Sequence, residues 1–272
     1  MNFEIIASIV LYHNDREKLT QVIDSFLNTE LSVKLILIDN SESDRLQNLS
    51  SDPRVEYIFN NKNLGFGKAH NIALRESIQV SKYHLVLNPD IYFDKGVLEE
   101  LYSFMERESD VGQLMPKILY PNGEIQYLCK LLPTPFDLMF RRFFGFLSIT
   151  KERNEIYELQ ASGYNQIMNV PYLSGCFMFF RSSALKKIGF FDERIFMYIE
   201  DADITRRLHQ SYRTLFYPFT HVYHHYAKGS YKNFKLMLFN IHGAFIYFTK
   251  WGWFNDPERV KINDRVLKNY MK

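Results

Sequence analysis

The sequence predicts an α/β fold in which a mostly parallel sheet is flanked by helices. Short apolar, β-branched runs alternate with amphipathic helical segments through the first ninety of its 272 residues. The connections are short, and polar clusters directly follow the ends of several apolar runs. Ligands bind beyond the carboxyl ends of the strands in sheets of this kind, so we expect the functional site there.

The first half supplies four strands and three helices. Four apolar runs predict buried strands at residues 5–11, 35–38, 55–59 and 83–87. Three helices are predicted from apolar residues that recur every three or four positions. These residues are Leu19, Val22, Ile23, Phe26 and Leu27, then Ala69, Ala73, Leu74 and Ile78, then Leu98, Leu101, Tyr102 and Met105. Asn14 and Glu17 resemble a capping box for the first helix, and we expect Asp94 to cap the third.

The second half is less regular. It predicts strands at residues 172–180 and 214–217 and helices at residues 183–188 and 200–209. Apolar residues at helical spacing predict a further helix over residues 234–248. We therefore expect a domain over residues 1–230, with halves at 1–110 and 111–230, and a C-terminal helical extension over 231–272.

The composition excludes several classes of protein. Hydrophobic residues make up 46% and charged residues 24%, which excludes a globally disordered chain. The 33 basic and 31 acidic residues give no electrostatic case for nucleic-acid binding. Cys129 and Cys176 cannot form a disulfide framework or a cysteine zinc site, so we expect a reducing compartment. Residues 1–10 lack a basic start, and long apolar runs are absent, which predicts a cytoplasmic protein without a signal peptide or membrane span.

Two acidic motifs are candidates for chemistry. Asn88-Pro89-Asp90 ends a predicted strand, and the Asp90 carboxylate could bind a hard divalent cation or cap a helix. Glu200-Asp201-Ala202-Asp203 opens a predicted helix, whose dipole stabilises negative charge. Three neighbouring acids also repel one another, which raises at least one pKa and favours a general base.

Two further clusters are weaker candidates. His221, His224 and His225 follow Pro218, and neutral imidazoles bind transition metals, although structural histidines are common. The loop from Asn63 to Gly67 has two glycines, through which backbone amides could approach a phosphate or sugar. A plain loop-to-helix turn would have the same sequence.

Taken in order, these motifs resemble glycosyltransferase family 2 of the GT-A enzymes, in its bacterial rhamnosyltransferase-like branch. The resemblance runs from about Ile5 to Ser230. Its segments are Leu11-Tyr12-His13-Asn14, Ile38-Asp39-Asn40-Ser41, Asn63-Leu64-Gly65-Phe66-Gly67 with Asn71, Leu87-Asn88-Pro89-Asp90, Leu173-Ser174-Gly175-Cys176, Gly189-Phe190-Phe191-Asp192-Glu193, Glu200-Asp201-Ala202-Asp203 with Arg207, and His224 with Gly229-Ser230.

The resemblance implies a role for each matching residue. The nucleotide would contact Leu11, Tyr12, Asn14, Asp39, Ser41, Gly65, Phe66, Gly67, Asn71 and Asn88, with Asp39 accepting from the N3–H of uracil or thymine. Asp90 and His224 would bind Mn²⁺ or Mg²⁺, although Asn88 replaces the usual first Asp of that motif. Asp201 would be the general base, with Glu200 as the rival. The donor and acceptor pocket would include Ser174, Gly175, Asp203 and Arg207.

The implied reaction is an inverting transfer of a sugar from a nucleoside-diphosphate sugar, dTDP-rhamnose or a UDP-sugar. The acceptor would be a growing cell-surface polysaccharide or lipid-linked glycan. The alternative is a non-catalytic nucleotide-sugar-binding subunit of a polysaccharide assembly complex, which Asn88 favours. A nucleotidyltransferase is rejected because residues 11–18 contain no glycine.

Aromatic residues are abundant, at 16%. One cluster comprises Phe136, Met139, Phe140, Phe143, Phe144 and Phe146 around Arg141 and Arg142. The predicted helix at 234–248 is flanked by Lys232, Lys235 and Lys250. It could pack on the domain or on a second subunit of a homodimer, lie on the inner face of the cell membrane, or stack on acceptor sugars.

Overall fold

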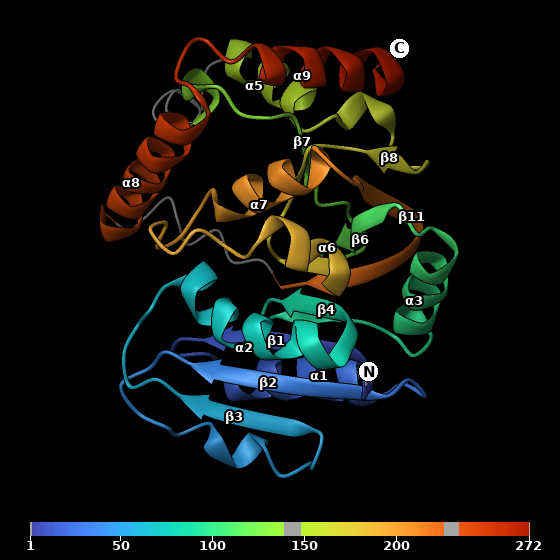
Figure 1. The fold of residues 1–272 in the computed structure, drawn as a ribbon, viewed down its shortest axis with the longest axis vertical. Coiled ribbons are helices and arrows are strands. Elements are labelled where there is room, and N and C mark those ends of the chain that lie inside the picture. Colours follow the sequence, from blue (N-terminus) through green and yellow to red (C-terminus); the bar gives the residue numbers. More distant parts are fainter. Residues whose placement is uncertain (1, 139–147, 226–233, 272) are drawn as a thin grey trace.

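The computed structural model describes residues 2–138, 148–225 and 234–271 (Figure 1). Its first half contains β1 (Phe3–Leu11), α1 (Arg16–Leu27), β2 (Val33–Asp39), η1 (Gln47–Leu49), β3 (Val55–Phe59), α2 (Phe66–Val80), β4 (Ser81–Leu87), β5 (Ile91–Tyr92) and α3 (Val97–Arg107). The middle contains β6 (Val111–Leu119), β7 (Cys129–Lys130), α5 (Ser148–Tyr157), η2 (Gln160–Ser162), β8 (Met168–Asn169) and β9 (Tyr172–Leu173). Then follow β10 (Phe177–Arg181), α6 (Ser182–Ile188), α7 (Glu200–His209), β11 (Arg213–His224), α8 (Phe234–Trp251) and α9 (Pro257–Tyr270).

A nine-stranded sheet organises the molecule, in the order β3-β2-β1-β4-β10-β6-β11-β5, with β8 also paired to β11. Strands β1 to β4 pair in parallel, as the alternation of the first half predicts. The second half departs from a parallel arrangement, because β10 runs antiparallel to both β4 and β6. The described chain is therefore an α/β fold with helices around a central, mixed sheet, and the predicted fold class is confirmed.

Two predicted helix caps are wrong in detail. Asp15, not Asn14, caps α1, and its Oδ1 accepts from the Lys18 backbone N–H at 3.0 Å. Asn14 instead accepts from the Tyr12 N–H at 2.7 Å and shapes the turn after β1. Helix α3 begins after Gly96, whose φ of 98° only glycine adopts readily, so Asp94 does not cap it.

Two predicted strands have different bounds. The run at 172–180 is broken into β9 and β10, and Ser174, Gly175 and Cys176 form the break. Strand β11 continues through Pro218 to His224, although the sequence predicts an end at Pro218. A shift in register between Tyr217 and His221 accommodates the proline, as expected for a bulge.

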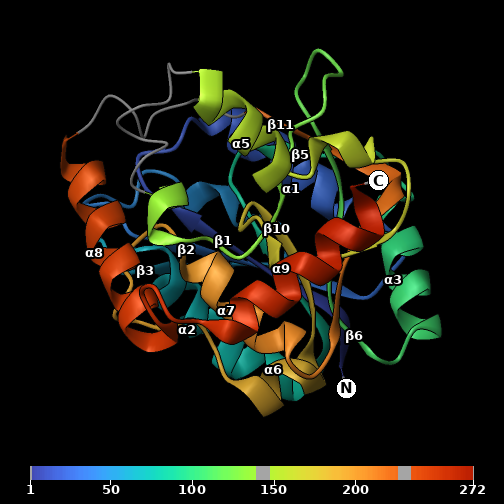
Figure 2. The same ribbon diagram turned by 90° about the horizontal axis from the view of Figure 1, so that it is seen from above.

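Helices α8 and α9 are held to α7 by two buried clusters of charge. Asp203 of α7 accepts hydrogen bonds from Lys250 and Trp251 of α8 at 2.7–2.9 Å. Arg206 of α7 makes a bidentate pair with Asp256, at 2.7 and 2.8 Å, just before α9. Figure 2 shows α8 and α9 on the side of the molecule where α7 lies. The boundary predicted at residue 230 lies outside the described residues.

Helix α8 has two different faces. Its inner face buries Ala244, Tyr247 and Phe248, which confirms packing on the domain. An exposed apolar stripe consists of Phe234, Leu238, Ile241 and Phe245, each at least 41% exposed. Among the described residues, no helix is both long and apolar enough to cross a membrane. The predicted aromatic cluster at 139–147, the flanking Lys232 and Gly229-Ser230 lie outside the described residues, whereas Phe136 packs against Arg153.

Candidate active site

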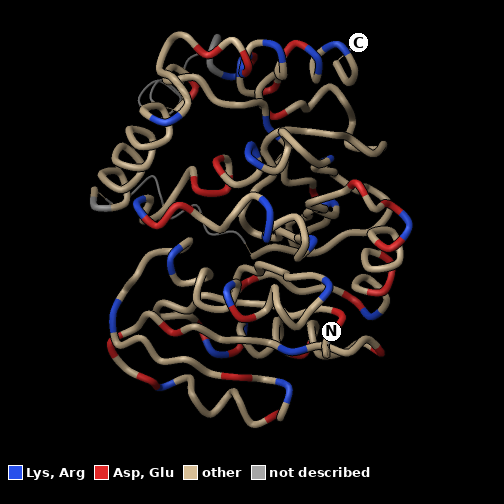
Figure 3. Tube along the Cα trace, in the orientation of Figure 1, with Lys and Arg blue, Asp and Glu red and all other residues tan. Residues whose placement is uncertain are grey.

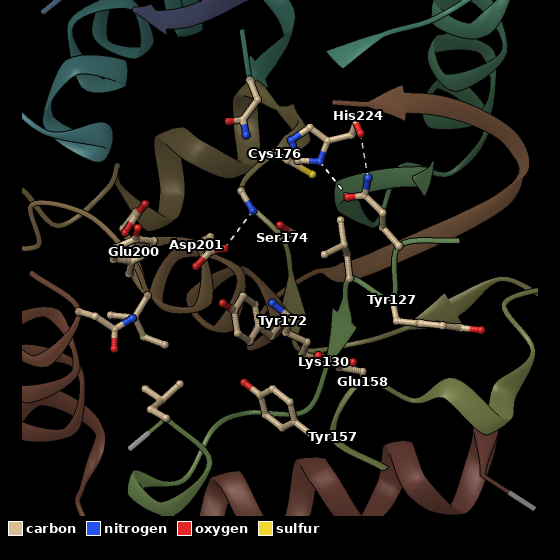
Figure 4. A pocket seen from close by; sticks show the side chains of 18 of the residues that line it. Tyr127, Lys130, Tyr157, Glu158, Tyr172, Ser174, Cys176, Glu200, Asp201 and His224 are labelled. Carbon is tan, nitrogen blue, oxygen red and sulfur yellow. Dashed lines mark hydrogen bonds between the residues drawn. The ribbon is translucent and has the colours of Figure 1, made fainter. Parts of the chain in front are cut away.

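A cavity of about 760 Å³ opens beside the carboxyl end of β4 and the first turn of α7. Among its lining residues are Asn88, Ser174, Gly175, Glu200, Asp201 and His224, which the sequence predicts for the site. Figure 4 shows His224 at one end of this cavity and Tyr157 at the other, with Ser174 and Asp201 between them. The break between β9 and β10 presents Ser174 and Gly175 to the cavity.

Asp90 and His224, which the sequence predicts as metal ligands and which we call the metal pair, meet where β4 and β11 end. Asp90 Oδ1 lies 3.2 Å from His224 Nε2. Gln126 fixes the ring, because its amide nitrogen donates to the His224 carbonyl at 3.0 Å and its oxygen faces Nδ1 at 2.9 Å. Nδ1 therefore carries the proton, and in the neutral ring the Nε2 lone pair faces Asp90. Two acceptors this close repel each other unless a proton or a cation lies between them.

The metal pair fits a divalent cation in donor type and spacing. Two donors about 2.1 Å from one ion at a right angle lie about 3 Å apart, close to the observed separation. Within the described ranges, no three His, Cys, Asp or Glu residues gather to hold a metal. Such a cation would thus depend on other oxygen ligands, as Mg²⁺ does when it shares substrate phosphates with one or two protein groups. His221 and His225 contact Tyr223 and Gln21 instead and lie outside the metal pair.

The first turn of α7 places two carboxylates in the cavity. Asp201 Oδ2 accepts from the Gly175 N–H at 2.9 Å, and Oδ1 accepts from the Ala202 N–H at 2.9 Å. Burial, together with the neighbouring Asp201 charge, raises the pKa of Glu200 well above its usual range. Glu200 Oε2 has no hydrogen-bond partner among the described side chains and backbone. The acidic motif predicts that one of its carboxyl groups has a raised pKa, and in the structure this group is Glu200.

The turn that leads into α7 is strained. Tyr198 and Ile199 both have positive φ, at 71° and 69°, a conformation that costs free energy in residues with a side chain. Helix α8 supports this turn, since a Cβ on Gly243 would lie 2.8 Å from the Tyr198 carbonyl oxygen. The extension therefore contributes to the position of Glu200 and Asp201.

Asp203 and Arg207 do not line the cavity, contrary to the sequence-based prediction. Successive helical residues are about 100° apart, so Asp203 points about 200° away from Asp201. Asp203 is fully buried, where it also accepts from Arg207 at 2.9 Å. Arg207 donates to the carbonyls of Ile188 and Phe190. Both residues are structural and connect α7 to its neighbours.

The residues predicted for the nucleotide base lie at the ends of β1 and β2, outside the lining of the cavity. Asp39 is buried and accepts from the Ser41 N–H at 2.8 Å and from the Tyr57 hydroxyl at 2.5 Å. Burial and this carboxylate raise the pKa of Tyr57, so its hydroxyl stays a donor. Leu11 accepts from the Asn40 N–H at 2.9 Å, which joins the two strand ends. Tyr12 is 44% exposed beside them.

Of the glycine-loop residues, only Phe66 lines the cavity. Gly65 has a φ of 82°, and a Cβ there would clash with the Phe196 carbonyl. Gly67 packs on Phe191, which would lie 2.7 Å from an added Cβ. Asn71 is buried and bonds both the N–H and the carbonyl of Phe191. Gly67 and Asn71 therefore hold the segment before α7, and their contact with the nucleotide stays a prediction.

The comparisons with known proteins agree with this architecture. The sequence model of glycosyl transferase family 2 matches residues 8–189. The chain belongs to glycosyl transferase family 2. An N-acetylglucosaminyl-diphospho-decaprenol L-rhamnosyltransferase of Mycobacterium tuberculosis is 27% identical over 216 residues, 75% of this chain and 70% of that protein. The low-salt glycan biosynthesis hexosyltransferase Agl10 of Haloferax volcanii is 28% identical over 178 residues, 64% of this chain and 52% of that protein.

Solved structures of similar fold include other GT-A glycosyltransferases. TarS 1–349 of S. aureus superposes with a TM-score of 0.56 at 18% identity, over 81% of this chain and 60% of that chain. GalNAc-T7, solved with UDP, GalNAc and Mn²⁺, superposes with a TM-score of 0.64 at 15% identity, over 85% of this chain and 45% of that chain. The family 2 chain thus spans less than two thirds of either solved chain, and the likeness establishes the GT-A fold.

The cavity of this family 2 protein also contains residues that the sequence did not indicate. They include Tyr120, Gln126, Tyr127, Lys130, Tyr157, Glu158, Tyr172 and Asn240. Most come from the irregular stretch between β6 and β9, and Asn240 comes from α8. The high tyrosine content of the sequence was the available signal for these residues. Because the tyrosines form no repeat or motif, it did not show which of them line the cavity. Burial raises the pKa of Cys176, another lining residue, to about 12, which keeps its thiol protonated.

Proposed function

We propose that the protein is an inverting glycosyltransferase that moves a sugar from dTDP-rhamnose or a UDP-sugar to a hydroxyl of a cell-surface polysaccharide or lipid-linked glycan. The observation that carries this proposal is the arrangement of one cavity. It is lined by Asp201 and by His224, and His224 lies 3.2 Å from Asp90. A base and an anion-binding end in one cavity are the two parts that a sugar transfer requires.

In the proposed reaction, Asp201 accepts the proton of the acceptor hydroxyl as its oxygen bonds to the anomeric carbon. The bond from that carbon to the nucleoside diphosphate breaks at the same time, so a single displacement inverts the configuration. Hydrogen bonds from Gly175 and Ala202 fix the carboxylate for this role. A divalent cation bound by Asp90 and His224 would neutralise the charge that develops on the departing diphosphate.

Nucleotide selection is proposed to depend on Asp39. Its carboxylate is buried at the carboxyl end of β2 and is oriented by Ser41 and Tyr57. A carboxylate retains further lone pairs after two hydrogen bonds and can accept from the N3–H of uracil or thymine. Guanine presents a different set of donors, so the Asp39 carboxylate should favour pyrimidine diphosphates.

Calorimetric titration tests the donor class and the metal together. With Mn²⁺ present, UDP or dTDP should bind and GDP should bind more weakly, while EDTA should weaken binding by about tenfold or more. Asp90→Asn should remove most of the difference between Mn²⁺ and EDTA. Asp94→Asn, at an exposed carboxylate four residues away, is the matched control and should behave as the wild type does.

Three results would count against this part of the proposal. Equal affinity with Mn²⁺ and EDTA would remove the metal role of Asp90 and His224. No binding of any diphosphate by folded protein would contradict the donor class. Normal nucleotide binding without sugar transfer to any acceptor would favour the alternative, a non-catalytic subunit that binds nucleotide-sugars.

We also propose that the exposed apolar stripe of α8 contacts the membrane surface, close to a lipid-linked acceptor. The same helix contributes Asn240 to the cavity, so contact through the stripe would bring the cavity to the bilayer. The name of the Mycobacterium relative specifies a decaprenol-linked acceptor, which supports this choice.

Sedimentation with vesicles of anionic phospholipid tests the stripe. Leu238→Glu with Ile241→Glu should reduce the bound fraction severalfold, because a buried carboxylate opposes insertion of the helix face. Val260→Glu changes a similarly exposed apolar residue on α9 and should leave binding unchanged. Equal binding by all three proteins would exclude the stripe as the membrane contact.

A further inference from the structure

The wall of the cavity that runs from beside Gln126 to the end of α5 has a distinct composition. We call it the tyrosine end and define it by Tyr127, Lys130, Tyr157 and Glu158, which all line the cavity. In Figure 4, Tyr157 and Glu158 lie farther from His224 than Tyr172 does, and Tyr127 lies between His224 and Glu158. The proposed function needs the diphosphate near the metal pair, which leaves the part of the tyrosine end around Tyr157 and Glu158 available for a second ligand.

The tyrosine end is held by backbone pairing, so it is formed before any ligand arrives. Lys130 is the register partner of Tyr172 where β7 pairs with β9, and its Nζ lies 4.9 Å from the Tyr172 ring centre. The Leu131 N–H donates to the Tyr157 carbonyl at 3.0 Å, which ties the end of α5 to the residue after β7. A preformed site loses little conformational entropy on binding.

Buried Tyr164 supports the other two residues of the tyrosine end. Its ring packs edge-on against Tyr127 with centres 5.2 Å apart. Its hydroxyl donates to the Glu158 carbonyl at 2.7 Å, and the Glu158 side chain accepts from Gln160 at 3.0 Å. Tyr127 and the Glu158 carboxylate are therefore oriented by contacts within the protein.

The chemistry of this end suits a sugar ring. Tyrosine rings offer flat apolar faces that pack against the C–H groups of a pyranose, and their hydroxyls bond its oxygens. A carboxylate and an ammonium provide an acceptor and a donor for hydroxyl groups. Flat faces with a few oriented polar groups are the usual composition of a small-molecule site.

We propose that the tyrosine end binds the acceptor through one pyranose ring and thereby presents a hydroxyl of that ring to Asp201. This inference rests on the proposed function for the identity of the acceptor, while the sugar site itself can be tested alone. Tyr127 and Glu158 would then determine which acceptor sugar is used. Tyr172 adjoins both this site, through Lys130, and Asp201, whose negative charge contributes, after burial, to the raised pKa of the Tyr172 hydroxyl.

The test is direct binding of methyl glycosides by saturation-transfer NMR, with the methyl glycosides of N-acetylglucosamine, glucose, galactose and rhamnose as ligands. Each is added to the wild-type protein, with and without UDP or dTDP and Mn²⁺. At least one should bind the wild type at millimolar concentration. Tyr127→Leu should weaken that binding by about tenfold, whereas Tyr127→Phe, which keeps the ring, should nearly preserve it.

Two further proteins keep the result interpretable. Glu158→Gln should also weaken the same glycoside by about threefold or more, because it loses the charged acceptor. Tyr102→Leu on α3, far from the cavity, should bind as the wild type does. Thermal unfolding of each variant shows whether it is folded, and nucleotide titration shows whether the metal end is intact.

The outcomes separate this inference from the proposed function. Glycoside binding that depends on Tyr127 and Glu158 supports the sugar site, even if no nucleotide binds and the proposed function fails. Nucleotide binding without binding of any glycoside to the wild type would overturn the sugar site and leave the proposed function standing. Glycoside binding that is equal in Tyr127→Leu and the wild type would also overturn it.

Discussion

Asp201→Asn is expected to lose at least about a hundredfold in sugar-transfer rate while binding nucleotide as the wild type does. The amide has nearly the same shape, and its oxygen can still accept from Gly175, although its nitrogen cannot accept from Ala202. The cavity should therefore keep its form with one hydrogen bond fewer. It cannot accept the proton of the acceptor hydroxyl, so the chemical step alone should suffer. Initial rates at saturating donor, with calorimetry of UDP or dTDP, measure the two effects separately.

Glu200→Gln is the matched comparison. The raised pKa of Glu200 means that its carboxyl holds a proton at higher pH than an ordinary glutamate, and the neutral glutamine resembles that form. We therefore expect Glu200→Gln to keep most of the activity where Glu200 is protonated. As the pH rises through the raised pKa of Glu200, the wild-type side chain ionises beside Asp201. The rate of the wild type should therefore change with the ionisation of Glu200, whereas Glu200→Gln should show no such change.

These two variants can also overturn the assignment. If Glu200→Gln loses the rate while Asp201→Asn keeps it, the two carboxylates exchange roles. If Asp201→Asn loses nucleotide affinity together with rate, the aspartate acts in binding or folding and the base assignment fails. A pH–rate profile of all three proteins distinguishes these cases.

The parts of this protein that sequence predicts are those encoded by neighbouring residues. Strands β1 to β4 follow from local apolar runs, and the Asp90 motif follows from the abrupt end of one such run. Asp201 sits at a helix start that the acidic motif marks. The family resemblance, which depends on the order of such motifs, is accordingly confirmed over residues 8–189.

What the sequence could not supply comes from contacts between distant residues. The sequence suggests Asp203 as a third member of an acidic site. In the structure, Asp203 instead accepts hydrogen bonds from Lys250 and Trp251, more than forty positions later in the chain. Asn71 similarly bonds Phe191 from a distant helix. The tyrosine end depends on the pairing of β7 with β9, two short strands that have no periodicity to detect.

Arg206→Met is expected to destabilise the protein by about 3–5 kcal/mol, the largest effect on stability that we predict. Arg206 is 1% exposed and holds Asp256 with two hydrogen bonds, while its guanidinium lies 4.1 Å from the Trp251 ring centre. Loss of this cation would leave the buried Asp256 carboxylate with only Arg259, whose guanidinium is 3.7 Å away and whose backbone N–H donates at 3.0 Å. Urea unfolding, followed by circular dichroism, gives the change in unfolding free energy.

A double variant separates the ion pair from simple loss of packing. Arg206→Met with Asp256→Leu removes both charges, and buried pairs replaced by apolar residues are often neutral in stability, so it should recover much of the loss. Arg213→Met breaks the more exposed pair with Asp110 and should cost about 1 kcal/mol or less. A loss below 1 kcal/mol for Arg206→Met would mean that this pair does not anchor the extension. A large loss would instead show that this pair anchors the extension to α7, the helix that begins with both cavity carboxylates.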